Sequence, residues 1–550
     1  MENKSAIKWI SQKAGGQKAK LLVLIVCNAL FSALSVLFAF AIKEIVDGAV
    51  SGNKDRLVTF SLVIFGIVIL QFVFRILING LTDHIRGRLE ILYKSHVFSE
   101  ILKKKQEKVS VYHSGELMNR LTSDVSTVAD GAVSILPTVV AAVTRLVCAV
   151  VALVLLDWVF AVAFTVAGAL VFLVVTLLRE KLKSLHKKTQ ETDGKVRSYM
   201  QECVENLLAV KVFSVGGKIE NTAKDLQERN FKIKMRRRNY SVTGHAVYNF
   251  IFSAGYLFAL IYGAVLILDG NLSYGSLSAI LQLVNNVQVP FASLSNILPK
   301  FYAMTASAER LMEIEDIESE DLGEGIDRDK VYENMTSIVV DGVDFTYDRD
   351  KVLKDASITV NKGDFVMIAG ASGVGKSTLM KLMLGVYQPD KGNIYVNGTD
   401  GDLTLSAGTR SLFSYVPQGN MLFSGTLKDN VTFVNTDASD QEIERALVIS
   451  DAKGFVDQLP NGINTVVGED GVGLSEGQIQ RIAIARAVLC NAPIVLLDEA
   501  TSALDEETEK RVLTNFKSIE DITLLIVSHR KAAENICNRV IKIKDKKFTE

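Results

Sequence analysis

Nine consecutive residues in the second half of the chain have the types and spacing of a phosphate-binding loop. They read Gly370-Ala371-Ser372-Gly373-Val374-Gly375-Lys376-Ser377-Thr378, and the first eight match the pattern G-x-x-x-x-G-K-[ST]. The glycines of such a loop let backbone N–H groups surround phosphate oxygens, and the N-terminus of the following helix adds a favourable dipole. Lys376 is expected to reach the β- and γ-phosphates, and Ser377 to hold Mg²⁺.

The segments that flank this loop are those that its chemistry needs. Phe365–Ala369 is a short apolar run that predicts a buried strand, and Leu379–Met383 continues at helical spacing. Strand, glycine-rich turn and helix in this order argue against a chance turn. Farther along, Ile494–Leu497 predicts an apolar strand that ends in the carboxylates of Asp498 and Glu499. Asp498 can coordinate Mg²⁺ through water.

The composition indicates several domains, one of them in a membrane. A chain of 550 residues is too long for one core, and its net charge of -1 gives no general argument for nucleic-acid binding. Apolar residues make up 48% of the chain, and their excess lies in the first 300 residues. The cysteines show no C-x-x-C pairing, so neither a disulfide framework nor a zinc site is expected.

Six segments are long and apolar enough to cross about 30 Å of hydrocarbon. We place them at Leu21–Ile42, Leu57–Ile78, Val133–Leu156, Trp158–Leu178, Gly244–Leu268 and Leu277–Leu298. Residues 1–20 are polar and basic, and the first apolar run lacks a small-residue cleavage site. This predicts an anchor in place of a removable signal.

The distribution of basic residues predicts the orientation of these spans. Lys and Arg number 5 before the first span, 8 in residues 79–131 and 16 in residues 179–243. The other three connections contain only Lys43, Lys54 and Arg56. By the positive-inside rule, both termini and both long connections are expected to be cytoplasmic.

The two long connections show helical periodicity, which predicts that the membrane helices continue into the cytosol. Within them, Tyr112–Arg120 and Glu205–Lys211 could be short contact elements or simple loops. Residues 308–335 are acidic and lose periodicity, which predicts a surface linker with a solvated face.

Polar residues inside the predicted spans are candidates for lining a substrate cavity. They are Arg145 in the third span, Asn249 in the fifth, and Gln282, Asn285, Asn286 and Gln288 in the sixth, just before Pro290. Snorkelling, hydrogen bonding between helices and a span drawn out of register are the alternatives. The strongest cavity candidates are Arg145, Gln282, Asn285 and Asn286.

Short β-branched runs alternate with helical segments in residues 336–550, which predicts an α/β domain with a largely parallel sheet. With the phosphate loop and the membrane half, the chain resembles a bacterial ATP-binding cassette (ABC) exporter half-transporter over nearly its full length. The resemblance implies an all-α six-helix transmembrane domain at 21–307 and an α/β P-loop NTPase cassette at 336–550, with a cytoplasmic segment before and the linker between.

The resemblance assigns roles to further residues. Tyr347 resembles the aromatic that stacks on adenine, and Gln418 the glutamine that senses Mg²⁺ and faces the membrane domain. Glu499 is similar to the residue that polarises the attacking water, and His529 to the histidine that contacts the γ-phosphate. With Lys376, these two are the expected catalytic residues.

The family signature is matched at Leu474-Ser475-Glu476-Gly477-Gln478, except that glycine is more usual in place of glutamate. Ser475 and Gly477 would present a hydroxyl and a backbone N–H to the γ-phosphate. Glu476 removes neither donor, although an anion there could weaken nucleotide binding. Thr465–Glu469 resembles the segment that touches the partner's cytoplasmic helices, and Ser502–Asp505 the communication loop between cassettes.

One phosphate loop and one signature per chain imply a dimer, because in this family each ATP lies between the phosphate loop of one cassette and the signature of another. Since Glu499 and His529 are both present, a homodimer is favoured; Glu476 keeps a heterodimer open. The short segments His113–Arg120 and Glu205–Lys211 resemble the coupling helices that convey cassette motion to the spans.

The predicted function is export of a substrate across the inner or plasma membrane, driven by ATP and Mg²⁺. An ATP-gated channel or regulator has the same architecture and is the alternative. An importer is disfavoured because the membrane domain precedes the cassette, and six spans argue against a soluble ATPase that acts on DNA. No peptidase domain is expected before the first span. Peptides, lipids and amphiphilic molecules remain open as substrates.

Overall fold

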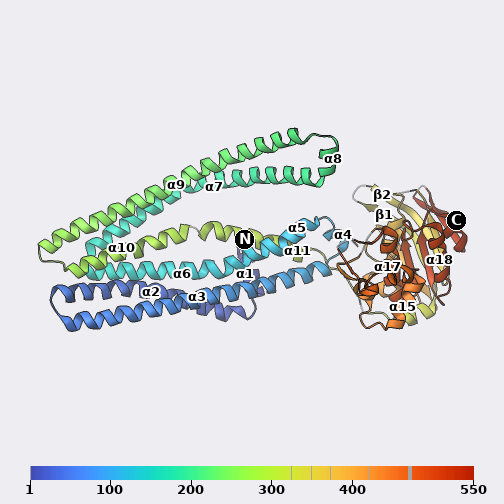
Figure 1. Cartoon of the computed structure of the whole chain (residues 1–550), viewed down its shortest axis with the longest axis horizontal. Coiled ribbons are helices and arrows are strands. Elements are labelled where there is room, and N and C mark those ends of the chain that lie inside the picture. The colour runs from blue at the N-terminus through green and yellow to red at the C-terminus, as the bar shows by residue number, and fades with distance from the viewer. Residues whose placement is uncertain are drawn as a thin grey trace. The chain divides into compact units, whose positions relative to one another are not determined.

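The computed structural model describes residues 2–295, 297–323, 325–347, 350–371, 373–419, 422–468, 473–544 and 546–549. The chain forms two compact units (Figure 1). One contains residues 1–101 and 114–316, and the other contains residues 102–113 and 317–550.

The first unit is helical. Its elements are α1 (Glu2–Lys13), α2 (Gln17–Val50), most of α3 (Lys54–Lys103), α5 (Ser114–Asn119), the π-helix η1 (Arg120–Asp124), α6 (Val125–Leu156), α7 (Trp158–Glu205), α8 (Leu207–Val212), α9 (Gly216–Leu268), α10 (Tyr274–Ser295) and α11 (Ile297–Asp316).

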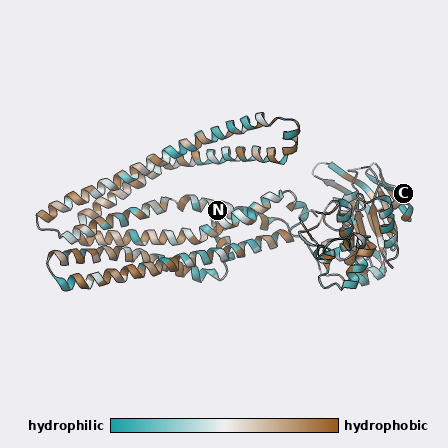
Figure 2. Ribbon diagram, in the orientation of Figure 1, coloured by the Kyte–Doolittle hydropathy of each residue, from teal (hydrophilic) through white to brown (hydrophobic). Residues whose placement is uncertain are grey.

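Five helical stretches of the described chain are long and apolar enough to cross a membrane, and they carry the first five predicted spans. They are α2, α3, the run Ser114–Leu156, α7 and α9. The sixth predicted span falls on α10, whose amide side chains lower its hydropathy below that of the other five. Figure 2 shows the apolar residues gathered on the halves of α7 and α9 that lie away from α8.

The long helices extend beyond the predicted spans, as the periodicity of the connections predicts. α7 and α9 run side by side over their length and are joined by the short helix α8 (Figure 1). α8 begins at Leu207 and covers most of the segment expected to be a contact element. α3 likewise continues as helix to Lys103.

α10 packs against α2 and α6, and close contacts fix it at the end where it begins. The Asp47 carboxylate of α2 accepts hydrogen bonds from the Ser273 hydroxyl and from the Gly275 N–H, both at 2.9 Å. A Cβ atom on Gly275 would lie 2.2 Å from the Lys43 carbonyl oxygen. Glycine is therefore required for α10 to approach the backbone of α2.

Gly275→Ala is expected to separate these helix ends and to lower the free energy of unfolding of the helical unit by about 1–3 kcal/mol. Backbone rather than a flexible side chain blocks the added methyl group. Gly66→Ala in α3 is the matched control, because nothing lies within 4 Å of its added Cβ. Thermal unfolding of both variants in one detergent measures the difference, and equal midpoints would contradict the expectation.

The N-terminal helix α1 is anchored on α3 and α11. The Trp9 ring stacks on Tyr93 with a centroid distance of 5.6 Å, and its indole N–H donates to Glu315 at 2.8 Å. Nε2 of His96 lies 2.5 Å from the same carboxylate oxygen.

Residues 308–316, expected in the linker, continue α11, and Ile314 is buried. Its acidic residues bind neighbouring helices, so the charge does not mark a purely solvated face.

Docking of α1 is expected to weaken at acidic pH. Burial alone would raise the pKa of Glu315, but hydrogen bonds from Trp9 and His96 hold it below its ordinary value of 4.5. Because the folded pKa is lowered, this contribution is complete above 4.5 and is lost as the pH falls through the folded value. Trp9 fluorescence in a Trp158→Phe background should report the transition. The same titration after Glu315→Gln should lack it.

The π-helix η1 carries a buried charge that joins it to α11. Asp124 is 2% exposed. It accepts hydrogen bonds from the Ser307 hydroxyl at 2.9 Å and from Nε of Arg310 at 2.9 Å. The hydrogen bonds with Asp124, and secondarily its charge, raise the pKa of Arg310. This joint lies where the predicted contact element meets α11. π-helical turns are rare and recur at functional positions, which is consistent with a role for this segment as a contact element.

The second unit is an α/β domain with a six-stranded and a four-stranded sheet. The strands are β1 (Met335–Tyr347), β2 (Asp350–Asn361), β3 (Phe365–Ala369), β4 (Lys391–Gly398), β5 (Leu403–Thr404), β6 (Phe413–Val416), β7 (Gly425–Thr426), β8 (Val466–Val467), β9 (Ile494–Asp498), β10 (Thr523–Val527), β11 (Arg539–Lys544) and β12 (Lys547–Thr549). The helices are α4 (Gln106–Val109), α12 (Arg328–Asn334), α13 (Lys376–Met383), α14 (Leu427–Val431), α15 (Asp440–Ile449), α16 (Lys453–Val456), α17 (Glu476–Leu489), α18 (Glu506–Phe516), α19 (Lys531–Ile536) and the 3₁₀ turns η2 (Ala407–Leu412), η3 (Thr432–Val434) and η4 (Gly462–Asn464).

The six-stranded sheet has the order β12-β11-β3-β10-β9-β6, and only β12 is antiparallel to its neighbour. This confirms the largely parallel sheet. β9 and β10 are buried along their whole length, as apolar runs covered on both faces require. The order puts the ends of β3, β9 and β10 side by side, and the predicted nucleotide residues follow these ends.

Candidate functional site

The predicted phosphate-binding loop lies between β3 and α13, as its flanking residues predict. Gly375 caps α13 with φ of 110°, and a Cβ atom there would lie 2.7 Å from Val352. Glycine is needed for both reasons. Lys376 is buried, and its ammonium group donates to the carbonyl of Gly370 at 2.7 Å. Ser372 lies outside the described residues.

Lys376 and His529 meet at this loop. Their side-chain nitrogens are 2.9 Å apart, although 153 residues separate them in sequence. Burial lowers the pKa of Lys376, and the charges of Glu499 and Asp498 oppose that effect. A cation is thus held near the two carboxylates at the end of β9, in the loop where a phosphate group is expected to bind.

Asp498 ends β9 and is held by two hydroxyl groups. Ser377 donates to one carboxylate oxygen at 2.9 Å and Tyr415 to the other at 3.2 Å. Burial raises the pKa of Asp498, and these hydrogen bonds only partly offset the rise. A divalent cation would relieve this cost, and hydroxyl and carboxylate oxygens are ligands that Mg²⁺ prefers.

Glu499 has a backbone φ of 50°, which is a strained value for a residue with a side chain. Its carboxylate accepts a hydrogen bond from Nε2 of Gln418 at 2.7 Å and lies 3.9 Å from Nε2 of His529. The structure therefore brings Glu499, Gln418, His529 and Lys376 together, as the motifs predict. Strain of this kind is concentrated at functional positions.

Tyr347 lies at the end of β1 in an aromatic cluster. Its ring contacts Phe345 edge-on at 4.9 Å and Tyr387 at 5.3 Å. The ring is half-buried, so one part of it is open to a ligand. Burial raises the pKa of its hydroxyl above the ordinary value.

The signature residues begin α17. The Ser475 hydroxyl accepts from the Gln478 N–H at 3.3 Å, and the Gln478 side chain accepts from the Ser475 N–H at 2.9 Å, which is a capping box. Glu476 is exposed in the first turn, where a carboxylate favours the helix dipole. A Cβ atom on Gly477 would lie 3.0 Å from the Ala503 carbonyl, so α17 closely approaches the segment 502–505. Of the segment 465–469, Glu469 lies outside the described residues.

The polar residues of the predicted spans do not form one group. Asn286 is buried and donates to the Ser35 carbonyl of α2 at 3.2 Å. This side chain therefore forms a hydrogen bond between helices, which was one of the alternatives to cavity lining. Gln282 is half-buried, whereas Asn285 is exposed. The Nε of Arg145 is buried and makes no hydrogen bond within the described part of the chain. Arg145 is thus the strongest cavity candidate.

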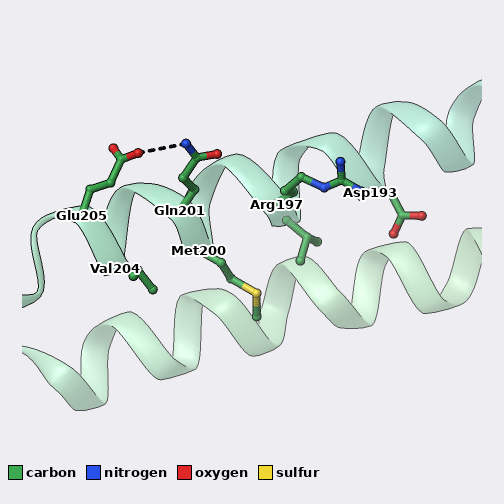
Figure 3. A pocket seen from close by; sticks show the side chains of 7 residues that line it. Asp193, Arg197, Met200, Gln201, Val204 and Glu205 are labelled. Carbon is green, nitrogen blue, oxygen red and sulfur yellow. Dashed lines mark hydrogen bonds between the residues drawn. The ribbon is translucent and has the colours of Figure 1, made fainter. Parts of the chain in front are cut away.

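A pocket of about 540 Å³ lies elsewhere, along the predicted cytosolic extension of α7 (Figure 3). Its lining residues are Asp193, Val196, Arg197, Met200, Gln201, Val204 and Glu205. Asp193 also binds α9, since Lys234 donates to it at 2.7 Å and holds its pKa below the usual value. None of the predicted substrate residues contributes to this pocket.

Comparison with known proteins decides the family. The profile described as "ABC transporter transmembrane region" matches residues 21–291, and that described as "ABC transporter" matches residues 353–502. The chain belongs to the ABC transporters. Both halves of an ABC exporter half-transporter are present in one chain, so a second chain is needed to complete the assembly.

Relatives of similar length support ATP-driven export by this ABC transporter. It is 27% identical to the ATP-dependent lipid A-core flippase of Syntrophus aciditrophicus, over 94% of this chain and 86% of that protein. Identity to the flippase of the same name from Escherichia coli (strain K12) is also 27%, over 96% of this chain and 91% of that protein. Export coupled to ATP hydrolysis is therefore favoured over an ATP-gated channel.

The fold also matches a solved exporter. A structure described as a bacterial Atm1-family ABC exporter with ATP bound superposes with a TM-score of 0.81, 22% identity and coverage of 97% of this chain and 95% of that chain. The transmembrane helices followed by a cassette are thus the ABC exporter fold. ATP use by this transporter follows from its cassette.

Sequence reasoning missed two side chains at the ATP site and one side chain in a predicted span. Tyr415 binds Asp498 from β6. Arg530 donates to the carbonyls of Ser502 and Leu504 and so shapes the segment that follows β9. Arg75 lies within a predicted span, with its guanidinium 5.9 Å from the centre of the Phe31 ring. A charge inside a span was a signal that could have found Arg75.

Proposed function

We propose that two copies of this chain form a homodimeric exporter that moves an anionic lipid or similar amphiphile across the cytoplasmic membrane. Both termini and the α7–α8–α9 extension lie in the cytoplasm in this proposal. The Lys and Arg count supports that orientation, with 16 of these residues in positions 179–243. The complete set of Glu499, Gln418 and His529 supports two equivalent ATP sites.

The ATP site has these proposed roles. Backbone N–H groups of Gly370, Gly373, Gly375 and Thr378, with Ser372, hold the phosphates, and Tyr347 stacks on the adenine. Lys376 neutralises phosphoryl charge, Glu499 accepts a proton from the attacking water, and His529 contacts the γ-phosphate. Ser475, Gly477 and Gln478 of the partner copy complete the site. The Glu499–Gln418 hydrogen bond at 2.7 Å is the observation that carries this assignment.

Mg²⁺ fits the donor atoms that the site offers. Ser377, Asp498 and Gln418 would hold the ion, which neutralises charge on the β- and γ-phosphates when it is bound. The buried Asp498 carboxylate, with its raised pKa, supports a cation at this position. Ser377 and Tyr415 orient that carboxylate from two sides.

Substrate selection is assigned to Arg145. Its buried Nε has no hydrogen-bond partner among the described residues, and a buried cation calls for an anionic partner. Gln282 and Asn285 are weaker candidates for the same proposed cavity, whereas the Asn286 amide is used in the hydrogen bond to Ser35 of α2. The relatives named lipid A-core flippases support a lipid with an anionic headgroup over a peptide.

The test measures ATPase stimulation in nanodiscs of phosphatidylcholine, with phosphatidic acid, lipid A or an apolar peptide added. Stimulation by the two phosphate lipids is expected, and Arg145→Ala should remove it while basal hydrolysis is retained. Arg145→Lys should keep part of it. Stimulation by the peptide alone would exclude the lipid proposal, and a native mass of one chain would exclude the homodimer.

A further inference from the structure

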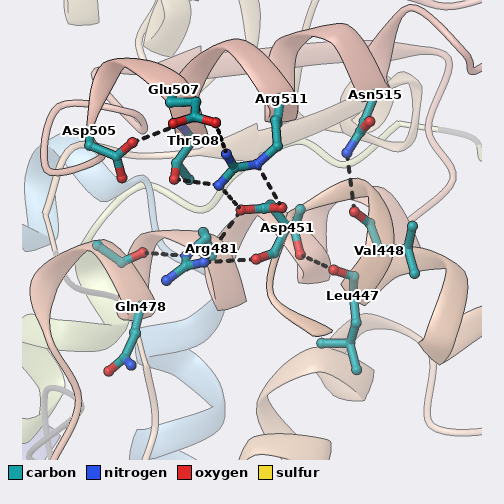
Figure 4. A network of polar contacts seen from close by, with 12 residues as sticks. Leu447, Val448, Asp451, Gln478, Arg481, Asp505, Glu507, Thr508, Arg511 and Asn515 are labelled. Atoms are coloured by element: carbon teal, nitrogen blue, oxygen red, sulfur yellow. Dashed lines mark hydrogen bonds and ion pairs between the residues drawn. The ribbon is translucent and has the colours of Figure 1, made fainter. Parts of the chain in front are cut away.

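A single carboxylate, that of Asp451, lies between two guanidinium groups where three cassette helices meet (Figure 4). Asp451 follows α15, Arg481 belongs to α17 and Arg511 to α18. The two carboxylate oxygens accept from Nε and Nη2 of Arg511 at 3.2 and 3.0 Å. Nη1 of Arg481 lies 3.5 Å from the same carboxylate and donates to the Asp451 carbonyl at 2.8 Å.

The end of α15 is held against α18 by a second side chain. One turn beyond Arg511, the amide of Asn515 donates to the carbonyls of Val448 and Ile449, both at 3.2 Å (Figure 4). Asp451 itself has φ of 56°. Asparagine and aspartate tolerate this left-handed conformation better than other residues with side chains. The chain thus turns sharply at Asp451 and leaves its carboxylate facing both arginines.

Both arginines occupy the same place in their helices. Arg481 lies six residues after the cap Ser475, which begins the signature helix α17, and Arg511 lies six residues after the cap Asp505, which begins α18. Asp505 ends the segment Ser502–Asp505, which we name the communication loop. The Asp451 carboxylate therefore links the helix that starts at the signature to the helix that follows the communication loop.

The negative charge of Asp451 stabilises the two positively charged arginines beside it. The Arg481 side chain is only 19% exposed, and burial lowers its pKa, with a further lowering by the charge of Arg511. Asp451 opposes both effects. Without it, Glu507, which pairs with Arg511 at 3.3 Å, and the charge of Asp505 near Arg481 would be left as counter-charges, and repulsion between the two guanidinium groups would favour a wider spacing of α17 and α18.

We propose that Asp451 is a positioning residue for ATP hydrolysis. Its carboxylate fixes the spacing between the signature helix and the communication loop. Both elements can then occupy their correct positions at the ATP site of the partner cassette at the same time. Asp451 does not touch the nucleotide. The proposal rests on the shared ATP site between two cassettes and on no assumption about the substrate or about which chain is the partner.

The first test replaces Asp451 with asparagine in the full-length protein in nanodiscs. Asparagine keeps the left-handed turn, removes the charge and replaces one of the two oxygens that accept from Arg511 with an NH2 donor. The kcat of ATP hydrolysis is expected to fall about tenfold, with the KM for ATP changed less than about twofold, because misplacement affects turnover more than nucleotide contacts. Asp457→Asn is the matched control, since Asp457 is 59% exposed beside Lys453. It should keep full turnover.

The second test separates positioning from a loss of stability. Adding Arg511→Gln to Asp451→Asn removes the facing guanidinium, so the double variant should recover a large part of the lost kcat. A stability defect would instead grow with the second substitution, and thermal unfolding of each variant measures that. Unchanged kcat in Asp451→Asn, or an additive loss in the double variant, would overturn the proposal.

Discussion

We expect Glu499→Gln to lower the rate of ATP hydrolysis by about 10²- to 10⁴-fold while ATP still binds, because glutamine cannot accept the proton of the attacking water. The substitution is close to isosteric, so the hydrogen bond with Gln418 can be retained. ATP should then hold the two cassettes closed. Nucleotide retained after gel filtration, together with phosphate release, measures both parts of this expectation.

Glu506→Gln is the control for this experiment. Glu506 is an exposed carboxylate in the first turn of α18, outside the cluster formed by Lys376 and His529. Its turnover should equal that of the unmodified protein. Turnover near normal in Glu499→Gln would show that another group activates the water.

Asp124→Asn should give the largest loss of stability among the variants considered. The substitution leaves Arg310 and Ser307 beside a neutral amide in a site that is almost closed to water. Removing one partner of a fully buried ion pair lowers the free energy of unfolding by about 3–5 kcal/mol. Because Arg310 is half-exposed to solvent, we expect a smaller decrease of about 2–3 kcal/mol here. Equilibrium unfolding of the detergent-solubilised protein in urea measures the change.

The matched control is Asp225→Asn on α9. Asp225 pairs with Arg229 at 3.6 Å, and both side chains are more than 70% exposed. A surface pair of this kind contributes about 0.5 kcal/mol or less. Equal losses in the two variants would show that the joint between η1 and α11 contributes no more than an ordinary surface pair.

The sequence predicts the parts of this protein whose signal is local. The strand before the phosphate-binding loop is five apolar residues in a row, and the loop itself is a contiguous pattern, so both are confirmed at the expected positions. Long apolar runs predict the membrane helices for the same reason. These features depend on neighbours along the chain and not on distant contacts.

Distant contacts were beyond prediction from one sequence. Asn286 could have faced a cavity or another helix, and only the position of Ser35 on α2 decides between them. Glu315 sits in an acidic stretch that resembles a linker, yet Trp9, some 300 residues earlier, binds its carboxylate. Asp451 has no motif at all, and its role depends on where α17 and α18 meet.

The unbroken length of α3, α7 and α9 has a mechanical consequence. These helices contain 50, 48 and 53 residues, which corresponds to about 75 Å each at 1.5 Å per residue. Only about 30 Å of that length is needed to cross a bilayer. Each helix is therefore a rod with more than half its length outside the membrane. α8 joins α7 and α9, so a force applied there acts on these two helices far from their membrane-spanning halves. A small tilt of the two helices then moves their opposite ends, and neither helix has to unwind.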